Sequence, residues 1–400
     1  MSKESKTIII ISALLVILQM TSSASIDQDL SPSSSPNSGL FAADLLRIAK
    51  SKTSENVIFS PISIQTALAM TYMGAAGKTA EELKNGLRLP SLDKDQVGQY
   101  FSQLLNKKSG EADLSIANRI FVGSDYPLKA DFNKMTENYF KSGAEALNFK
   151  DLPSEAIQTI NSWVENKTNN KITDLMKPGS VDADTVALIV NAIYFKGKWK
   201  NPFSKDATRK LPFWINKDES VEVDMMYGGD KRIKYGEFSE INATAIEMAY
   251  KNSDISMMLI LPNEKDGLAD LENKLSSMSV IDLSSKMGSR KVDIMLPKFQ
   301  INFSTPLSET LKEMGIQSLF QKADLPGMFE SGPAVKVSDV QHKAFIDVNE
   351  AGSEAAAASF LQISLMSLDY DQRFFNADHP FFFAIKGPNT VYFVGHVAKP

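Results

Sequence analysis

The most informative part of this sequence is residues 345–367, which read FIDVNEAGSEAAAASFLQISLMS. Residues 335–348 alternate as a β-strand does, and a run of small residues follows Gly352. In an extended chain, alternate side chains share one face. On one such face every residue is small or apolar, namely Ser353, Ala355, Ala357, Ser359, Leu361 and Ile363. The segment can therefore enter the middle of a β-sheet without burying a charge.

A surface helix is the alternative interpretation of the same segment, because alanine has the highest helix propensity. Two observations weigh against it. Gly352 stands where the strand would become a helix, and residues 360–368 return to strand-like content. In addition, the polar residues Glu354 and Gln362 both fall on the other face of an extended chain.

The first half of the chain carries helix signals. Spacing and capping residues predict helices over residues 41–49, 60–72, 79–87 and 156–168. Ser60 is the expected cap of the second, with Pro61 at its first position. Thr79-x-x-Glu82 is a capping-box pattern that predicts where the third helix begins.

Strand signals dominate the last 220 residues. Residues 185–195 form a nearly continuous β-branched and aromatic run, as expected of a central strand covered on both faces. Further strands are predicted over residues 255–261, 291–296, 335–340, 381–385 and 391–397. The last two flank a Gly387-Pro388-Asn389 turn and form a hairpin. This segregation of helices from strands indicates the α+β class, with large antiparallel or mixed sheets.

The N-terminus has the pattern of a targeting segment. Lys3 and Lys6 precede an apolar run over residues 7–18, and small polar residues follow. This order predicts a secretory signal peptide over residues 1–24 and a secreted, extracellular product. A membrane anchor is the alternative, but the run is shorter than the ~20 residues that cross a bilayer. Residues 25–39 are rich in Ser and Pro and predict a flexible N-terminal tail.

Residues 40–400 contain no linker-like stretch, which predicts one large domain. The chain has no cysteine, so its stability cannot depend on disulfides. The net charge of −5 argues against nucleic acid or an anionic membrane as the main partner. Lys107-Lys108 is too short a basic run to indicate a polyanion site. Asn166, Asn242 and Asn302 lie in glycosylation sequons.

No catalytic or metal-binding motif stands out. The three histidines, His342, His379 and His396, lack zinc-binding spacing, and nucleotide-binding loops and nucleophile elbows are absent. We therefore expect no enzymatic activity, no metal and no cofactor. A Ser–His–Asp triad assembled in space stays open, because sequence order does not exclude one. A secreted hydrolase is thus an alternative for which no particular residue gives evidence.

Four further motifs, taken with Glu350, Gly352 and the alanine run, resemble the serpin family, and its inhibitory members in particular. The resemblance extends over residues 40–400. Its motifs are Asn56-x-x-Phe59-Ser60-Pro61-x-Ser63, Asn191-x-x-Tyr194-Phe195-Lys196-Gly197-x-Trp199, Phe375-x-Ala377-Asp378-His379-Pro380-Phe381 and Phe393-x-Gly395. One departure is His396, where many members have arginine.

The resemblance implies a serpin fold: a single domain with a large central mixed β-sheet, further sheets, surrounding helices and an exposed reactive loop. The hinge of that loop corresponds to Glu350, Gly352, Ser353, Ala355, Ala356, Ala357 and Ala358. Family spacing from Glu350 places the scissile bond between Met366 and Ser367, with Leu365 and Leu368 as alternative cut sites.

The resemblance also implies two structural sites. Ser60, Ser63, Asn191 and His342 correspond to a polar cluster beneath the main sheet, where its strands separate. Trp199, Lys298 and Glu350 correspond to the place where the loop first enters that sheet. Without the resemblance, each residue would be interpreted as ordinary core or surface structure.

The implied function is inhibition of a serine protease by a suicide-substrate mechanism. The protease cleaves the loop, stays attached as an acyl-enzyme, and is trapped when the loop inserts into the sheet. Met366 suits an apolar specificity pocket, so we expect an elastase- or chymotrypsin-like protease, held in a covalent complex by a monomeric inhibitor. The alternative within the family is a non-inhibitory carrier, storage or chaperone-like protein. The small hinge residues weigh against it, since such members carry bulky, charged or proline residues there.

Overall fold

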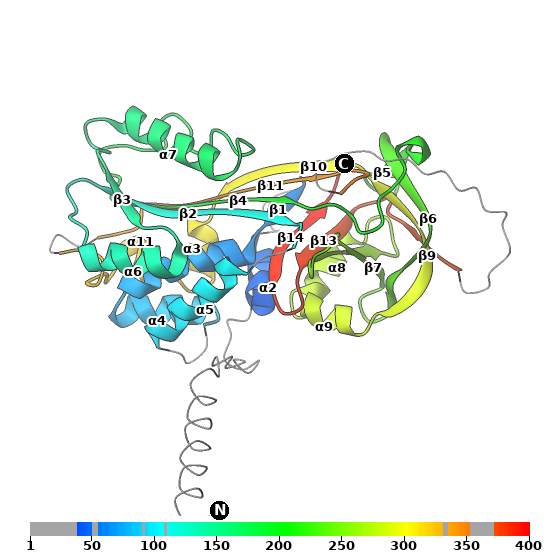
Figure 1. Ribbon diagram of the computed structural model, residues 1–400, viewed down its shortest axis with the longest axis horizontal. Coiled ribbons are helices and arrows are strands. Elements are labelled where there is room, and N and C mark those ends of the chain that lie inside the picture. The colour runs from blue at the N-terminus through cyan, green and yellow to red at the C-terminus, as the bar shows by residue number, and fades with distance from the viewer. Residues whose placement is uncertain (1–37, 50–54, 90–92, 108–109, 331–334, 353–371) are drawn as a thin grey trace, which may run out of the picture. The chain divides into compact units, whose positions relative to one another are not determined.

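The computed structural model describes residues 38–49, 55–89, 93–107, 110–330, 335–352 and 372–400 (Figure 1). The predicted signal peptide, most of the predicted N-terminal tail, and residues 353–371 of the predicted reactive loop lie outside the described residues. No helix in the described part of the chain combines the length and apolar character that a membrane crossing requires.

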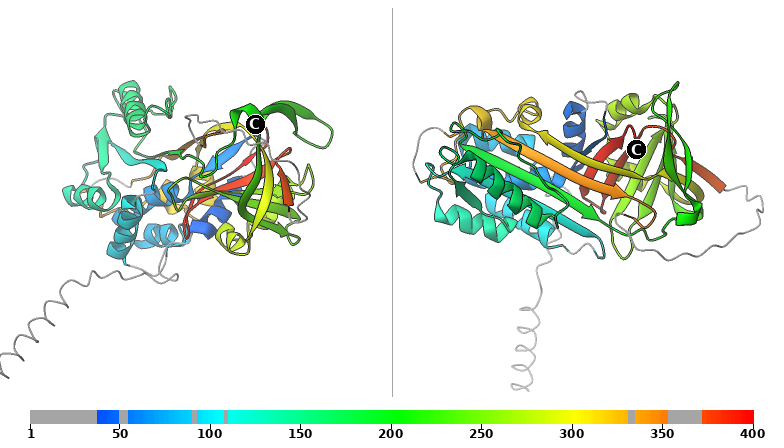
Figure 2. Two further views of the ribbon diagram at one scale, coloured as in Figure 1. Left: turned by 45° about the vertical axis from the view of Figure 1, so that its right-hand side comes forward. Right: turned by 90° about the horizontal axis from the view of Figure 1, so that it is seen from above.

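One half of the fold is built around a five-stranded mixed sheet. Its strand order is β10 (Phe299–Pro306), β11 (Asp339–Val348), β4 (Ala187–Lys196), β2 (Asp113–Gly123) and β3 (Ala144–Leu147). β11 and β4 are parallel neighbours, paired from Asp339↔Leu188 to Phe345↔Tyr194. Seen from above, the orange β11 lies beside the green β4 (Figure 2, right). β10 and β2 flank this pair in antiparallel orientation.

Helices cover both faces of this sheet, which explains the continuous apolar run in β4. Leu188, Val190 and Ala192 belong to one apolar cluster with α7 (Pro153–Lys167). The alternate residues Ile189 and Ile193 join the main core, which includes α3 (Pro61–Gly74). Figure 1 shows α7 on one side of the sheet and α3 on the other. Every residue of α3 is buried.

A nine-stranded sheet forms the second part of the core. Its order is β1 (Val57–Phe59), β14 (Val391–Val397), β13 (Phe381–Lys386), β8 (Ser256–Pro262), β7 (Ala243–Ala249), β6 (Ser220–Phe238), β9 (Gly288–Pro297) and β12 (Gln372–Asn376), with β5 (Arg209–Trp214) on β6. β13 and β14 are the predicted hairpin, closed by a Gly387 N–H to Thr390 carbonyl bond of 2.9 Å.

The remaining helices lie around the two sheets. They are α2 (Ser38–Ala49), α4 (Gly77–Gly86), α5 (Lys94–Asn106), α6 (Ala130–Phe140), α8 (Leu268–Leu275), α9 (Val280–Ser285), α10 (Ser308–Glu313) and α11 (Ser318–Gln321), with a 3₁₀ turn η3 (Lys205–Ala207). The predicted α+β class, with a large mixed sheet, further strands and surrounding helices, is confirmed.

Two local predictions were wrong. α4 begins at Gly77 and its cap residue, Ala76, makes no side-chain capping bond, so Thr79-x-x-Glu82 is not a capping box. Instead the Thr79 hydroxyl accepts the Asp324 N–H at 2.9 Å, and Glu82 accepts backbone N–H groups that follow α10. The strand predicted from residue 335 begins only at Asp339; Val335 makes an isolated bridge to Ala323.

Candidate functional site

A buried polar network lies at the junction between β4 and β11. Asn191 on β4 and His342 on β11 are register partners, and both are fully buried. The His342 Nδ1–H donates to Asn191 Oδ1. The Asn191 amide then donates to Ser63 Oγ on α3 and to Asn118 Oδ1 on β2. Three adjacent strands and the helix beneath them are therefore joined by one set of hydrogen bonds.

Asn118 is a member of this network that the sequence did not indicate. It is the register partner of Asn191 on β2. Its Oδ1 also accepts from the Ser63 hydroxyl at 3.2 Å, and its amide donates to the Ser63 carbonyl at 3.2 Å. No signal in the sequence pointed to it, because residues 113–123 were not predicted as a strand and an asparagine is ordinarily solvent-facing.

Ser60 has a different position from its three predicted companions. Its hydroxyl caps α3 by accepting the Ser63 N–H at 3.3 Å. It therefore contacts the network through the Ser63 backbone, whereas Ser63, Asn191 and His342 are joined by side chains. The predicted helix cap at Ser60 is confirmed, as is Pro61 at the first position.

His342 is held uncharged by its surroundings. Burial lowers the pKa of His342 to about 3 and outweighs the opposing effect of the Ile58 backbone. The ring stacks on Phe59, with centroids 5.8 Å apart. Among the described residues, its Nε2 makes no hydrogen bond of good geometry. The contact between β4 and β11 at this level is thus a neutral hydrogen bond.

The chain that leaves β11 turns across the carboxyl end of β4. Asn349 and Gly352 exchange backbone hydrogen bonds of 2.9 and 3.1 Å. The Trp199 N–H donates to the Ala351 carbonyl at 2.9 Å, and its indole Nε1–H donates to the Asn349 carbonyl at 3.0 Å. The indole stacks on Tyr250 at 4.6 Å between centroids, which fixes its position. The predicted loop-entry residue Trp199 therefore contacts the hinge directly.

Gly352 cannot be replaced without strain. Its φ of +130° is a backbone conformation that side chains rarely adopt. A Cβ added there would lie 2.1 Å from the Gly197 carbonyl oxygen and 2.7 Å from the Trp199 nitrogen. The absence of a side chain allows the turn to approach the segment after β4 this closely.

Glu350 ties the same turn to its neighbours. Its carboxylate lies 3.2 Å from the Lys298 ammonium and accepts a 2.9 Å hydrogen bond from the Thr208 hydroxyl. Burial alone would raise the pKa of Glu350, but hydrogen bonds from its own backbone, Thr208 and Lys298 outweigh burial and lower it. The predicted pair Lys298–Glu350 is thus in contact, and Thr208 is a partner that the sequence did not indicate.

The structure describes only some of the other predicted site residues. Ser353, Ala355, Ala356, Ala357, Ala358, Met366 and Ser367 lie outside the described residues. The three sequon asparagines, Asn166, Asn242 and Asn302, are all exposed.

The two remaining histidines contact acceptors through both ring nitrogens. His379 contacts Asp378 at 2.8 Å and the Pro262 carbonyl at 2.7 Å. His396 contacts Glu272 at 2.7 Å and the Glu55 carbonyl at 2.8 Å. Neither ring has a nitrogen left to activate a serine, so neither is arranged as the base of a triad. Within the described ranges, no group of three or more His, Asp or Glu side chains could hold a metal.

A family model and several known proteins match this chain over most of its length. The family model described as "Serpin (serine protease inhibitor)" matches residues 36–400. Serine protease inhibitor 42Dd of Drosophila melanogaster is 41% identical over 358 residues, which cover 88% of this chain and 94% of that protein. Leukocyte elastase inhibitor of Bos taurus is 34% identical over 370 residues, which cover 90% and 97%.

Solved structures share the fold. Serpin48 of the insect Tenebrio molitor superimposes with a TM-score of 0.85 at 29% identity, covering 94% of this chain and 99% of that one. Human thyroxine-binding globulin, solved with its ligand, superimposes with a TM-score of 0.81 at 28% identity, covering 93% and 99%.

Proposed function

This chain belongs to the serpin family, and on that basis we propose that it inhibits serine proteases as a suicide substrate. The protease cuts near Met366–Ser367, and the cut loop inserts as a new strand between β4 and β11. The parallel pairing of these two strands, with the hinge turn at the carboxyl end of β4, is the observation that supports the proposal.

Insertion at this junction is favourable for a physical reason. A chain that reverses direction after β11 runs antiparallel to β11, and therefore also to its parallel neighbour β4. Its entry replaces one parallel pairing by two antiparallel pairings. Antiparallel ladders are slightly more stable per residue, and the new strand adds hydrogen bonds along its whole length. The small-residue face of residues 353–359 reduces the steric obstacle to entry.

The side-chain hydrogen bond of the polar network that joins β4 to β11 can break at a low cost in free energy. Separating β4 from β11 breaks the bond between His342 and Asn191. Because His342 is uncharged, no buried ion is left behind. Asn191 keeps its hydrogen bonds to Ser63 and Asn118 when the strands part.

Capture follows from the chemistry of the protease. Its serine attacks the Met366 carbonyl carbon, the bond to the Ser367 nitrogen breaks, and that nitrogen leaves as an amine with the transferred proton. The Met366 acyl group stays on the serine as an ester. If insertion is faster than hydrolysis, it pulls the ester out of register with the oxyanion hole, and water no longer releases the protease.

The proposed target is an elastase- or chymotrypsin-like protease outside the cell. Met366 and the neighbouring Leu365 fit an apolar specificity pocket, and Leu368 is a further cut site of the same type. The similarity to a relative named leukocyte elastase inhibitor supports this target class. Residues 1–24, proposed as a signal peptide, would direct the chain to secretion, with glycans on the exposed sequons.

A non-inhibitory carrier is the second candidate. The likeness to a thyroxine-binding globulin supports it, since that relative was solved with a small-molecule ligand. The hinge sequence favours inhibition instead, because Ser353, Ala355 and Ala357 carry no charge or bulk on the face that would enter the sheet.

One incubation separates the two candidates. The intact chain is mixed with elastase and with chymotrypsin, and the products are separated on a denaturing gel. Inhibition gives a band that survives boiling, at the mass of the protease plus the chain up to Met366, because residues 367–400 separate after the cut. Complete cleavage without such a band would reject the inhibitor and favour the carrier.

A further inference from the structure

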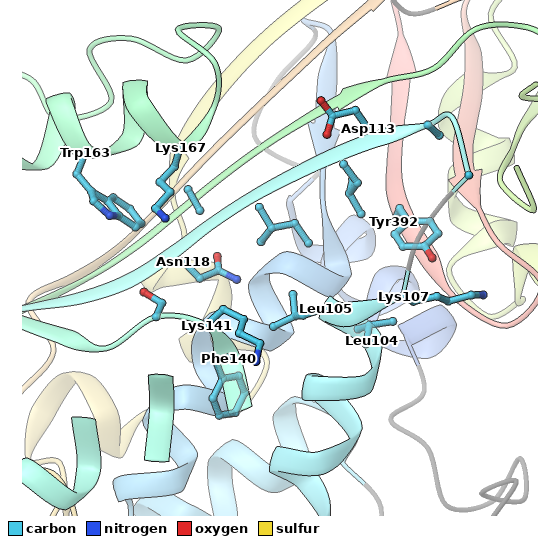
Figure 3. Close-up of a pocket in the computed structure, with 16 residues that line it drawn as sticks. Leu104, Leu105, Lys107, Asp113, Asn118, Phe140, Lys141, Trp163, Lys167 and Tyr392 are labelled. Atoms are coloured by element: carbon cyan, nitrogen blue, oxygen red, sulfur yellow. The ribbon is translucent and has the colours of Figure 1, made fainter. Parts of the chain in front are cut away.

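A cavity of about 450 Å³ lies beside the unpaired part of β2. β3 pairs only with Ile120–Gly123, so residues 113–119 of β2 have β4 on one side and no strand on the other among the described residues. Figure 3 shows Trp163 and Lys167 of α7 on one side of β2, and Leu104, Leu105 and Phe140 on the other. The volume falls in the range of small-molecule sites, about 300–1,000 Å³.

Two buried hydrogen-bond donors in the cavity wall have no partner. They are the Ser142 hydroxyl and the Trp163 indole Nε1, and no acceptor among the described residues reaches either. Ser142 is 91% buried, and Trp163 is held by Arg119, whose guanidinium lies 4.6 Å from the ring centroid. Buried donors are almost always paired, because leaving one unpaired costs free energy. Both are therefore free to donate to an acceptor from outside the described chain.

The charges around the cavity are mainly positive. Lys107, Lys141 and Lys167 line it, against the single carboxylate of Asp113. Lys107 is paired with Asp254 at 2.6 Å, so its charge is already matched. Lys141 and Lys167 are exposed at the rim and available to an anion.

The wall also carries an apolar surface, formed by Leu104, Leu105, Leu114, Ile116, Phe140 and Tyr392, beside the amide of Asn118 and the small residues Gly110, Ala112 and Ala117. An apolar surface of this kind accepts a hydrocarbon chain, and the donors and lysines accept an anionic head. The apolar surface, together with the hydrogen-bond donors and lysines, selects one class of ligand.

We infer that this cavity binds a single-chain amphiphile with a carboxylate head group, of the fatty-acid type. The carboxylate accepts hydrogen bonds from the Ser142 hydroxyl and the Trp163 indole and is neutralised chiefly by Lys141. The alkyl chain lies against the leucines and Phe140. The inference uses residues outside the hinge and the reactive loop, so it stands independently of the inhibitory function.

Titration with dodecanoate tests the inference on the full chain. Binding is followed by calorimetry below the micelle concentration, and by the fluorescence of the three tryptophans, Trp163, Trp199 and Trp214. We expect saturable binding of one dodecanoate per chain, with dodecanol about tenfold weaker because it lacks the charge. Trp163→Phe keeps the ring but removes the donor, and should abolish most of the fluorescence change and weaken binding.

Two lysines of the same region provide a matched comparison. Lys141→Asn removes a cavity charge while suiting the left-handed backbone of this residue, φ 58°. Lys134→Gln removes an exposed charge from α6 that does not line the cavity. We expect about a fivefold loss of affinity in the first variant and none in the second.

Three results would overturn the inference. They are the absence of saturable binding, equal affinity for dodecanoate and dodecanol, and equal loss in Lys141→Asn and Lys134→Gln. Circular dichroism of each variant excludes unfolding as the cause of a loss, and Ser142→Ala, a minimal change at the same cavity, serves as a second variant.

Discussion

Acid should destabilise the folded chain through His342, because this imidazole binds a proton readily only when the chain is unfolded. The ring is fully buried, and its pKa is lowered from 6.5 to about 3. Since the folded state resists protonation, acid favours the unfolded state, whose imidazole binds the proton freely. The stability that comes from the neutral ring is complete above about pH 6.5 and is lost as the pH falls towards 3. The variant His342→Asn removes this titration while keeping an amide donor for Asn191.

The size of the effect follows from the two pKa values. Each pKa unit corresponds to about 1.4 kcal/mol of differential stability. At about pH 5 the unfolded imidazole is nearly all protonated and the folded one is not, so the loss relative to about pH 7.5 is about 2 kcal/mol. Towards pH 3 the loss approaches about 5 kcal/mol, a large part of the ~5–15 kcal/mol typical of folded proteins.

Guanidinium unfolding at several pH values measures the effect. The free energy of the first unfolding transition is compared between the natural chain and His342→Asn. Subtracting the two pH profiles removes the carboxylates and the other histidines, which titrate in both proteins. We expect the difference to change by about 2 kcal/mol between about pH 7.5 and about pH 5. Parallel profiles would refute the buried, neutral state of His342.

Four further outcomes are expected. Gly352→Ala should destabilise the hinge by about 1–3 kcal/mol and raise the fraction of inhibitor consumed as substrate, because its Cβ meets the Gly197 carbonyl; unchanged stoichiometry and unfolding would contradict the hinge geometry. Asn118→Ala should cost about 2–3 kcal/mol and Ser60→Ala about 1 kcal/mol, since the first breaks the buried network and the second only a helix cap; equal costs in denaturant unfolding would place Ser60 in the network after all. Met366→Arg should shift inhibition towards trypsin-like proteases, whose pocket carboxylate pairs with arginine, and an unchanged preference in association rates would move the scissile bond elsewhere. Mild oxidation should slow capture by elastase in the natural chain but not in Met366→Leu, because the sulfoxide is polar; equal slowing of both would assign the effect to another of the 17 methionines.

Much of the fold could be predicted where local pattern and tertiary environment agree. β4 is buried on both faces, so its continuous apolar run identified it as a central strand. The cap at Ser60 and the hairpin at Gly387 depend on neighbours within a few residues, and both were predicted correctly. The resemblance to serpins supplied the long-range pairing of Asn191 with His342 and of Lys298 with Glu350, which local pattern cannot give.

The wrong and the missing predictions concern residues whose hydrogen-bond partners are distant in the sequence. Thr79 and Glu82 have capping chemistry, but their side-chain oxygens accept hydrogen bonds from backbone N–H groups more than 200 residues away. Asn118 has the appearance of a solvent-facing residue, and its burial depends on Asn191 and Ser63, 73 and 55 residues away. The cavity was not predicted either, because its wall combines residues from α5, β2, α6, α7 and β14.

The unfolding temperature of the chain before and after a single cut within residues 360–368 tests loop insertion most directly. If the cut loop enters between β4 and β11, about ten residues gain ladder hydrogen bonds, and the unfolding temperature should rise by about 10 °C or more. An unfolding temperature that stays the same or falls after the cut would mean that the loop remains outside the sheet, and would contradict the proposed mechanism of inhibition.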